Sequence, residues 1–184
     1  MYKTPISILD FETTGLKSKS ERVIEVGVLR IENNEVVAKF EALINPEKPI
    51  NQFVQRLTGI TNDDVSSAPK FVDIADQLEE ILQGTIMVAH NAKFDVAFLL
   101  AELERIQRRR KIKYLCSVQL SRKVFNEYKS HSLDAIIKRY NLKLDNRHRA
   151  LDDARYVYEL LKIIKRQYTP DVFNNIFEQM IRSR

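Results

Sequence analysis

The sequence predicts an α/β fold in which a mixed sheet carries helices on both faces. Three strand-like segments follow one another at 6–11, 23–32 and 36–44: the first is mostly apolar, the second alternates in polarity, and Asn33-Asn34 marks a turn between the last two. Further along the chain, segments with apolar residues at helical spacing alternate with short apolar runs. An antiparallel three-strand meander, continued by crossover helices and parallel strands, accounts for both patterns.

The rest of the chain supplies the helices and the parallel strands. In order, we expect a helix, a strand, a helix, a strand and two more helices, at residues 70–82, 85–89, 91–105, 114–117, 132–140 and 151–167. Asn91 and Ser132 are expected to cap their helices. Before these elements, Phe53 and Leu57 are expected to pack as one helical turn. The order β-β-β-α-β-α-β-α-α is that of a ribonuclease H-like arrangement, with the end of the first strand at the sheet centre.

Length and composition favour a single domain over residues 1–184, with its core at about 5–167 and a C-terminal amphipathic helix at about 170–182 that has Pro170 in its first turn. No run approaches the ~20 apolar residues that a membrane span requires. A single cysteine, Cys116, excludes an internal disulfide. We therefore expect a cytoplasmic protein. The formal net charge of +5 modestly favours a polyanionic partner.

Two carboxylates stand at the end of the first predicted strand. Because strand side chains alternate, Asp10 and Glu12 point to one face, which also carries Ile6 and Ile8. Two acids on a core-side face repel each other and lose hydration. A divalent cation between them is the simplest expectation.

Three more residues are candidates for the same buried region. Asp95 lies on an apolar helical stripe, although an acid in a first turn is commonly placed there by the helix dipole alone. Asp153 is in register with apolar positions of the longest helix, whereas Asp152 is in register with polar positions and is expected to face water. His148 fits the loop just ahead of that helix and would point toward the same pocket, although taken alone such a histidine is commonly a solvated surface residue.

These side chains suit metal-assisted phosphodiester hydrolysis. Oxygen donors without cysteine favour Mg²⁺ or Mn²⁺. Two ions about 3.5 to 4 Å apart can hold the attacking and the leaving oxygen, with Asp10 as the bridging ligand. A neutral His148, with a pKa near the usual ~6.5, can take the proton of the attacking water.

Three segments resemble the exonuclease motifs of the DEDD superfamily, histidine subtype. In order along the chain they are Asp10-Phe11-Glu12-Thr13-Thr14-Gly15, His90-Asn91-Ala92-Lys93-Phe94-Asp95 and His148-Arg149-Ala150-Leu151-Asp152-Asp153. The resemblance runs from about Ile6 to Gln167. The segments Leu57-Thr58-Gly59-Ile60-Thr61 and His131-Ser132-Leu133-Asp134 are further similar to parts of the proofreading epsilon subunits of bacterial DNA polymerase III.

The resemblance implies a 3′-to-5′ exonuclease with a ribonuclease H-like fold and two bound metal ions. Carried over by motif, the catalytic and metal-site acids are Asp10, Glu12, Asp95 and Asp153, and the general base is His148. The implied pocket for the 3′-terminal nucleotide consists of backbone at Phe11 and Thr13 and the side chains of Thr14, Leu16 and Asn91. Leu16 is placed as a wedge beside the terminal base, and Phe94 as a core residue behind the pocket.

Three functions remain open from the sequence. The first is a proofreading or repair exonuclease acting on single-stranded or frayed DNA 3′ ends. Whether such an exonuclease would bind a polymerase subunit stays open from the sequence. Epsilon subunits carry an extension that tethers them to the polymerase, whereas this chain ends at Arg184. The second is a stand-alone exoribonuclease or single-strand nuclease, similar to ribonuclease T or oligoribonuclease. The third is a non-catalytic nucleic-acid-binding module, which the competent residue types at all five catalytic positions disfavour.

A basic run at residues 105–113 also has two interpretations. Cations near a helix C-terminus are locally favourable, so a solvated helix end is the default. A phosphate track leading to the site is the alternative.

Overall fold

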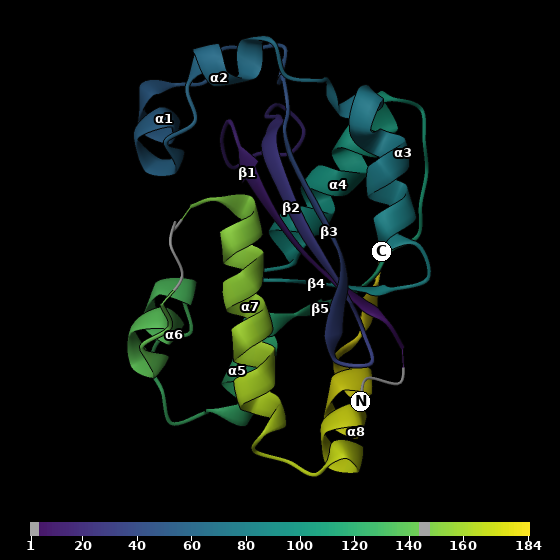
Figure 1. Cartoon of the computed structure of the whole chain (residues 1–184), viewed down its shortest axis with the longest axis vertical. Coiled ribbons are helices and arrows are strands. Elements are labelled where there is room, and N and C mark those ends of the chain that lie inside the picture. Colours follow the sequence, from purple (N-terminus) through teal and green to yellow (C-terminus); the bar gives the residue numbers. More distant parts are fainter. Residues whose placement is uncertain (1–3, 144–147) are drawn as a thin grey trace.

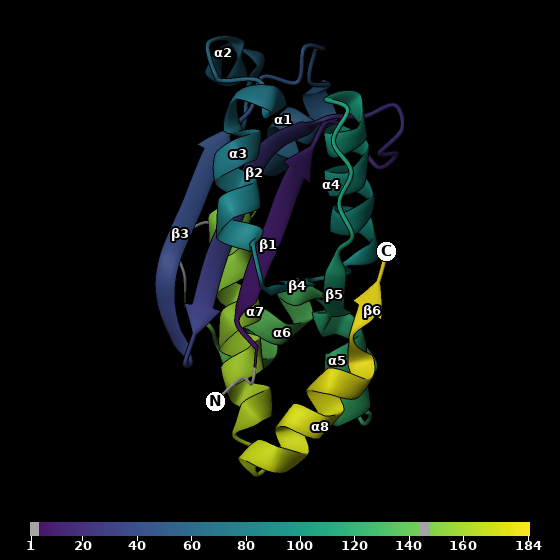
Figure 2. The same cartoon turned by 90° about the vertical axis from the view of Figure 1, so that its right-hand side faces the viewer.

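The computed structural model of the chain describes residues 4–143 and 148–184 and contains the predicted mixed sheet. β1 (Ile6–Thr13), β2 (Val23–Glu32) and β3 (Glu35–Leu43) form the antiparallel meander, and β4 (Ile86–Ala89) and β5 (Lys113–Cys116) run parallel to β1. The strand order is β3-β2-β1-β4-β5-β6. The short β6 (Arg182–Ser183) pairs antiparallel with β5, and Figure 2 shows how α8 (Pro170–Met180) leads into it.

β1 occupies the centre of the sheet and runs two residues past the predicted strand end. Asp10 and Glu12 therefore lie within the strand, opposite Gly27 and Glu25 of β2. On the other side, β4 pairs only with residues 6–8 of β1 and ends at Ala89. The edge of β1 from residue 9 onward consequently extends beyond β4.

Helices cover both faces of the sheet (Figure 1). Ile6 and Ile8 pack with α5 (Ser117–Val124), α6 (Leu133–Tyr140), α7 (Ala150–Lys165) and α8. Leu9 and Phe11 pack on the opposite face with α3 (Phe71–Leu82) and α4 (Lys93–Arg105). The predicted alternation of β1 is thus confirmed, and Asp10 and Glu12 share the face that α7 covers.

Several local predictions are confirmed at the helix ends. Ser132 caps α6, because its hydroxyl oxygen accepts a hydrogen bond from the Ala135 N–H at 3.3 Å. Pro170 stands in the first turn of α8, where its missing N–H costs no helical bond. Phe173 and Phe177 of α8 are buried in the core cluster, so this helix covers the core. None of the helices in the described ranges is both long and apolar enough to cross a membrane.

Two other local predictions are wrong, and a third is confirmed with its bounds shifted by one residue. In α1 (Gln52–Thr58), Phe53 and Leu57 are 67% and 44% exposed, because Val54 and Thr58 are the positions that face inward. α1 is followed by α2 (Asn62–Ser66). Asn91 does not cap α4; its backbone is left-handed, with φ 64°, and the helix begins after Ala92. The expected strand at 114–117 ends one residue early, and Ser117 opens α5, which the sequence did not predict.

Candidate active site

Side chains from β1 and from the start of α7 meet at one point. Carboxylate oxygens of Glu12 and Asp153 and a ring nitrogen of His148 all lie within 4.8 Å of one another. Asp153 is 4% exposed, and the other two are half-buried. Two hard carboxylates beside an imidazole are a donor set that fits a divalent cation. This trio is Glu12, His148 and Asp153. Asp10 lies on the same face of β1, two residues before Glu12, but is not part of the trio.

The start of α7 fixes two members of this trio. His148 lies in the loop ahead of the helix, as predicted, with a left-handed backbone at φ 63°. Arg149 is extended and serves as N-cap residue, and its carbonyl accepts the first helical hydrogen bond from the Asp153 N–H at 2.9 Å. A single helical turn therefore separates the histidine from the acid that it faces.

Asp152 does not face water, contrary to the sequence prediction. The residue is 8% exposed, and its carboxylate is paired with the guanidinium of Arg155 one turn further along α7. The long arginine side chain covers the acid, and α6 packs against α7. Burial alone thus does not distinguish Asp152 from Asp153. The direction of the side chain does, because only Asp153 points toward Glu12.

Asp95 reaches β1 from α4, on the opposite face of the sheet. Its Oδ1 accepts a hydrogen bond from the Phe11 N–H at 3.3 Å, and the residue is 2% exposed. That N–H is accessible because β4 has already ended at Ala89. Burial raises the pKa of Asp95 to about 8, and hydrogen bonds from the backbone N–H groups of Asp95 and Phe11 offset part of this rise. Asp95 thus contacts β1 at Phe11, the residue between Asp10 and Glu12, and is not part of the trio.

The loop after β1 is held rigidly and presents Leu16. The Thr14 hydroxyl donates to Glu21 Oε2 at 2.5 Å and accepts from the Arg22 N–H at 3.0 Å. The Asn51 side-chain amide donates to the Thr14 carbonyl at 3.2 Å. Leu16 is 85% exposed, whereas Thr14 is only 3% exposed. The Thr14 side chain therefore supports the loop, and Leu16 is the member free to meet a ligand.

The remaining residues of the predicted pocket come from β1 and from the segment after β4. Phe11 and Thr13 are buried, and the Thr13 hydroxyl donates to the Gly15 carbonyl at 2.7 Å. Asn91 is exposed at the end of β4. Phe94 packs against Phe98 with ring centroids 4.8 Å apart, which is the core position expected of it.

Part of the basic run serves the fold. The Arg105 guanidinium donates to the backbone carbonyls of Ser18 and Lys19, at 2.6 and 3.1 Å. Arg108 pairs with Glu79 at 2.6 Å, and Arg110 donates to the Leu82 carbonyl at 3.0 Å. These three arginines tie the end of α4 and the segment after it to the β1–β2 loop and to α3, so they are not a merely solvated helix end. The phosphate track stays a prediction.

Two residues of β2 beside the site were missed by the sequence reasoning. Glu25, fully buried, binds Arg149 and the Ala150 N–H at the start of α7. Gly27 leaves space for the same helix, since a Cβ there would lie 2.2 Å from the Leu151 nitrogen. The available signal was an acid and a glycine at alternate positions of residues 23–29, which are otherwise apolar.

Comparison with known proteins gives one family and several relatives. The profile of a family described as exonuclease matches residues 7–161. The DNA polymerase III PolC-type of Bacillus subtilis (strain 168) is 35% identical over 161 residues, which is 86% of this chain and 11% of that protein. The chain thus spans only a small part of the curated relatives that it matches.

Two solved structures share the fold. Exonuclease X, in complex with 5′-overhanging duplex DNA, is 23% identical with a TM-score of 0.72, over 94% of this chain and 99% of that chain. The nuclease domain of 3′hExo, a DEDDh family member bound to rAMP, is 20% identical with a TM-score of 0.70, over 90% of this chain and 94% of that chain. The predicted mixed α/β fold is thereby confirmed.

Proposed function

Because the chain belongs to the exonuclease family, whose profile it matches over residues 7–161, we propose that it removes nucleotides from single-stranded or frayed DNA 3′ ends by two-metal hydrolysis. Family membership confirms the resemblance seen in the three motifs. The observation that carries the mechanism is the meeting of Glu12, His148 and Asp153 within 4.8 Å. The buried Asp95 is bonded to the N–H of Phe11, the residue before Glu12.

The residues divide the chemistry between them. Asp10, Glu12, Asp95 and Asp153 would hold the two divalent ions, Mg²⁺ or Mn²⁺. When bound, such ions neutralise the phosphate charge and lower the pKa of a coordinated water. His148 then takes the proton of the attacking water at a ring nitrogen, from a position close to Glu12 and Asp153.

The 3′-terminal nucleotide is proposed to lie on the loop after β1. Backbone at Phe11 and Thr13 and the side chain of Asn91 would contact the nucleotide, and Thr14 would act by holding the loop. The exposure of Leu16, at 85%, supports its role as a wedge beside the terminal base.

The biological setting is proposed from the relatives. Since proteins named DNA polymerase III are 35% identical to the chain, proofreading in the cytoplasm with a DNA polymerase as partner is the proposed role. We treat residues 1–184 as one exonuclease domain with a core at about 5–167. The pairing of β6 with β5, near the end of the chain, supports this extent and adds α8 to the core.

A direct assay tests the activity. A 5′-labelled DNA strand and its RNA counterpart are each incubated with Mg²⁺ or Mn²⁺, with Asp10→Ala as the inactive control. We expect a ladder that shortens from the 3′ end of DNA. Activity that survives chelation, or that Asp10→Ala retains, would contradict the two-metal mechanism. Faster digestion of RNA than of DNA would favour an exoribonuclease instead, and equal rates on matched and mismatched primer ends would contradict proofreading.

The base is tested separately. His148→Gln should keep the rise in melting temperature that Mn²⁺ produces, while turnover falls about 10²- to 10⁴-fold, the usual contribution of a general base. His148→Asn is a matched variant, because asparagine tolerates the left-handed backbone at this position. Wild-type turnover in either variant would remove His148 as the base.

A further inference from the structure

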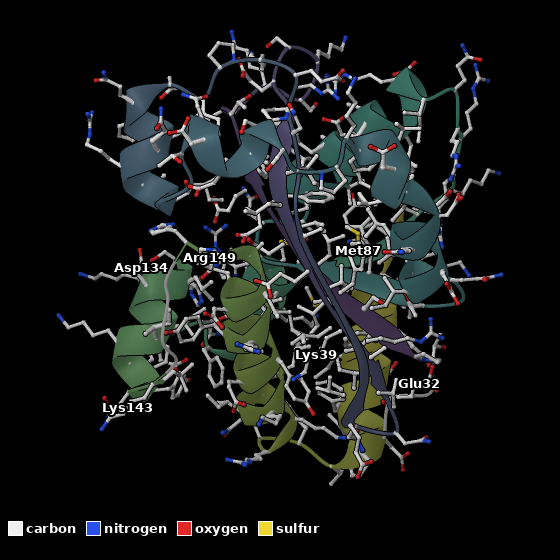
Figure 3. All side chains as sticks on the ribbon, turned by 45° about the horizontal axis from the view of Figure 1, so that its top comes forward. Glu32, Lys39, Met87, Asp134, Lys143 and Arg149 are labelled. Carbon is white, nitrogen blue, oxygen red and sulfur yellow. The ribbon has the colours of Figure 1, made fainter. Side chains whose placement is uncertain are left out.

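We propose that Glu25 is a positioning residue for His148: its buried carboxylate clamps Arg149, labelled in Figure 3, and the first N–H of α7, and thereby fixes the histidine beside Glu12 and Asp153. The inference rests on the proposed function, because it assigns Glu25 a part in the reaction that His148 is proposed to assist. It adds a residue from β2, a strand that contributes none of the proposed metal ligands.

Both oxygens of Glu25 are committed to the start of α7. Oε1 accepts from Arg149 Nε at 2.8 Å and lies 2.6 Å from Arg149 Nη2, and Oε2 accepts from the Ala150 N–H at 2.8 Å. The side chain is 0% exposed. A buried carboxylate is stable only with such partners, and the forked guanidinium is well suited to supply them. Glu25 is therefore a clamp rather than another metal ligand.

The helix needs this external partner. The N-cap residue of α7 is Arg149, whose side chain makes no capping hydrogen bond within the described residues. The first N–H groups of a helix lack partners inside the helix and carry partial positive charge. The carboxylate of Glu25 satisfies one of them from a neighbouring strand. It therefore does the work of an N-cap, and it also binds the side chain of the N-cap residue itself.

The register of the sheet turns this clamp into a positioning device. Glu25 stands opposite Glu12, and Gly27 stands opposite Asp10, so all four positions face α7. Gly27 allows the backbone of α7 to approach β2 closely. His148 precedes Arg149 directly, and the Arg149 carbonyl accepts from the Asp153 N–H. His148 is thus joined by a peptide bond, and Asp153 by a hydrogen bond, to Arg149, the residue that Glu25 holds.

The neighbouring Glu41 provides a matched control. Its carboxylate lies 3.9 Å from Arg149 Nη2 and is 44% exposed, so it shares the charge of Glu25 without the hydrogen bonds. If charge near Arg149 were sufficient, Glu41→Gln would have an effect comparable to that of Glu25→Gln. If the buried clamp matters, only Glu25→Gln will alter the reaction.

The first experiment measures steady-state kinetics of the full chain on 5′-labelled DNA with Mn²⁺. For Glu25→Gln we expect kcat to fall about 10- to 100-fold, as is typical when a group that orients an active-site residue is removed. KM and the Mn²⁺ midpoint should stay within about threefold of wild type, since the ligands are retained. Glu41→Gln should match wild type. An unchanged kcat, or a Mn²⁺ midpoint that moves as far as kcat does, would overturn the proposal.

A double variant tests the route through His148. In the His148→Gln background, Glu25→Gln should reduce kcat by no more than about threefold, because the base it positions is already gone. Losses that multiply would mean that Glu25 acts through the metal ligands or through the fold as a whole, which would overturn the proposal. Arg149→Lys serves if Glu25→Gln does not fold, since it keeps the charge but loses the fork; it should lower kcat with KM unchanged.

A spectroscopic readout separates this inference from the activity. The chain has three histidines, and His131 is held by Ser121 at 2.8 Å in the core, remote in sequence from the clamp. In proton NMR of the histidine rings, Glu25→Gln should shift or broaden the His148 signal, identified by its loss in His148→Gln, while the His131 signal is unchanged. An unmoved His148 signal would overturn the proposal even in an active enzyme. A wild-type chain without a DNA ladder would instead contradict the proposed function.

Discussion

The N-termini of α4 and α7 bring acids to β1 from opposite faces of the sheet, and they start alike. Each helix follows a residue in the left-handed conformation, Asn91 at φ 64° and His148 at φ 63°. In neither does the N-cap side chain make a capping hydrogen bond within the described residues. Each then places an aspartate in the first turn, Asp95 in α4 and Asp153 in α7.

The two ends differ in what holds them. At α4 the proposed metal ligand is itself the anchor, because Asp95 accepts from the Phe11 N–H of β1. At α7 the anchor is a separate carboxylate, Glu25 of β2, and Asp153 faces Glu12 and His148. The α4 acid is therefore fixed by the strand before any ion binds, whereas the α7 acid depends on how its helix is docked. This difference predicts which substitutions lower turnover and which lower the free energy of unfolding.

The largest expected effect distinguishes the adjacent acids of α7. Asp153→Asn should lower turnover by about 10³-fold or more, because it removes the carboxylate of a proposed metal ligand from the trio of Glu12, His148 and Asp153. Asp152→Asn should stay within about threefold of wild type, because its carboxylate is paired with Arg155 instead. The measurement is single-turnover cleavage of DNA in saturating Mn²⁺. Equal losses in the two variants would contradict the assignment of Asp153 to the site.

The α4 acid predicts a dependence of stability on pH. The pKa of Asp95 is raised by burial from the ordinary 3.8 to about 8, so between these values the folded chain holds a proton that the unfolded chain has lost. The free energy of unfolding should therefore fall as pH rises from about 4 to about 8, by up to about 1.4 kcal/mol per pH unit, and level off above. Urea denaturation in EDTA measures this slope.

Two controls sharpen this test. Asp95→Asn should flatten the slope, because the titrating group is gone, and the variant should be more stable than wild type near pH 8 in EDTA. Mn²⁺ should stabilise the wild type more strongly as pH rises, since cations bind the ionised carboxylate. A wild-type profile already flat in EDTA would mean that Asp95 is not protonated in the folded state.

The docking of α7 is tested at Gly27. A Cβ at this position would lie 2.2 Å from the Leu151 backbone nitrogen, so Gly27→Ala forces the helix away from β2. We expect a loss of about 1 to 3 kcal/mol in the free energy of unfolding, as for other overpacked sites, together with reduced turnover as His148 and Asp153 shift. Gly84→Ala is the control: its φ of 70° strains an alanine, but the space is open. It should lower stability without lowering turnover.

Much of this architecture was predictable from local patterns. The alternation of β1 placed Asp10 and Glu12 on the face covered by α7, and helical register placed Asp153 toward that face. Such periodic patterns survive in the fold because each element buries one face. The prediction that Asp152 faces water was wrong because helical register gives only the direction of a side chain. It does not show that the Arg155 side chain pairs with Asp152.

The features that were missed depend on pairs of elements. Glu25 and Gly27 acquire their meaning only from the strand register opposite Glu12 and Asp10 and from the helix that lies above them. Asn91 was read as an N-cap, a role for which its residue type is suited, yet the strand-to-helix turn required a left-handed residue there. Asparagine is suited both to an N-cap and to a left-handed turn, and the turn between β4 and α4 places Asn91 in the second role.

The smallest expected effect concerns the turn before α4. Asn91→Ala should lower the free energy of unfolding by about 1 kcal/mol, because alanine is strained in the left-handed region that asparagine tolerates. Asn91→Gly should stay within about 0.5 kcal/mol of wild type, since glycine adopts this φ freely. Urea denaturation of both variants checks the difference. An alanine variant as stable as the glycine variant would mean that the turn can relax, and that the bond from Phe11 to Asp95, rather than the turn, sets where α4 begins.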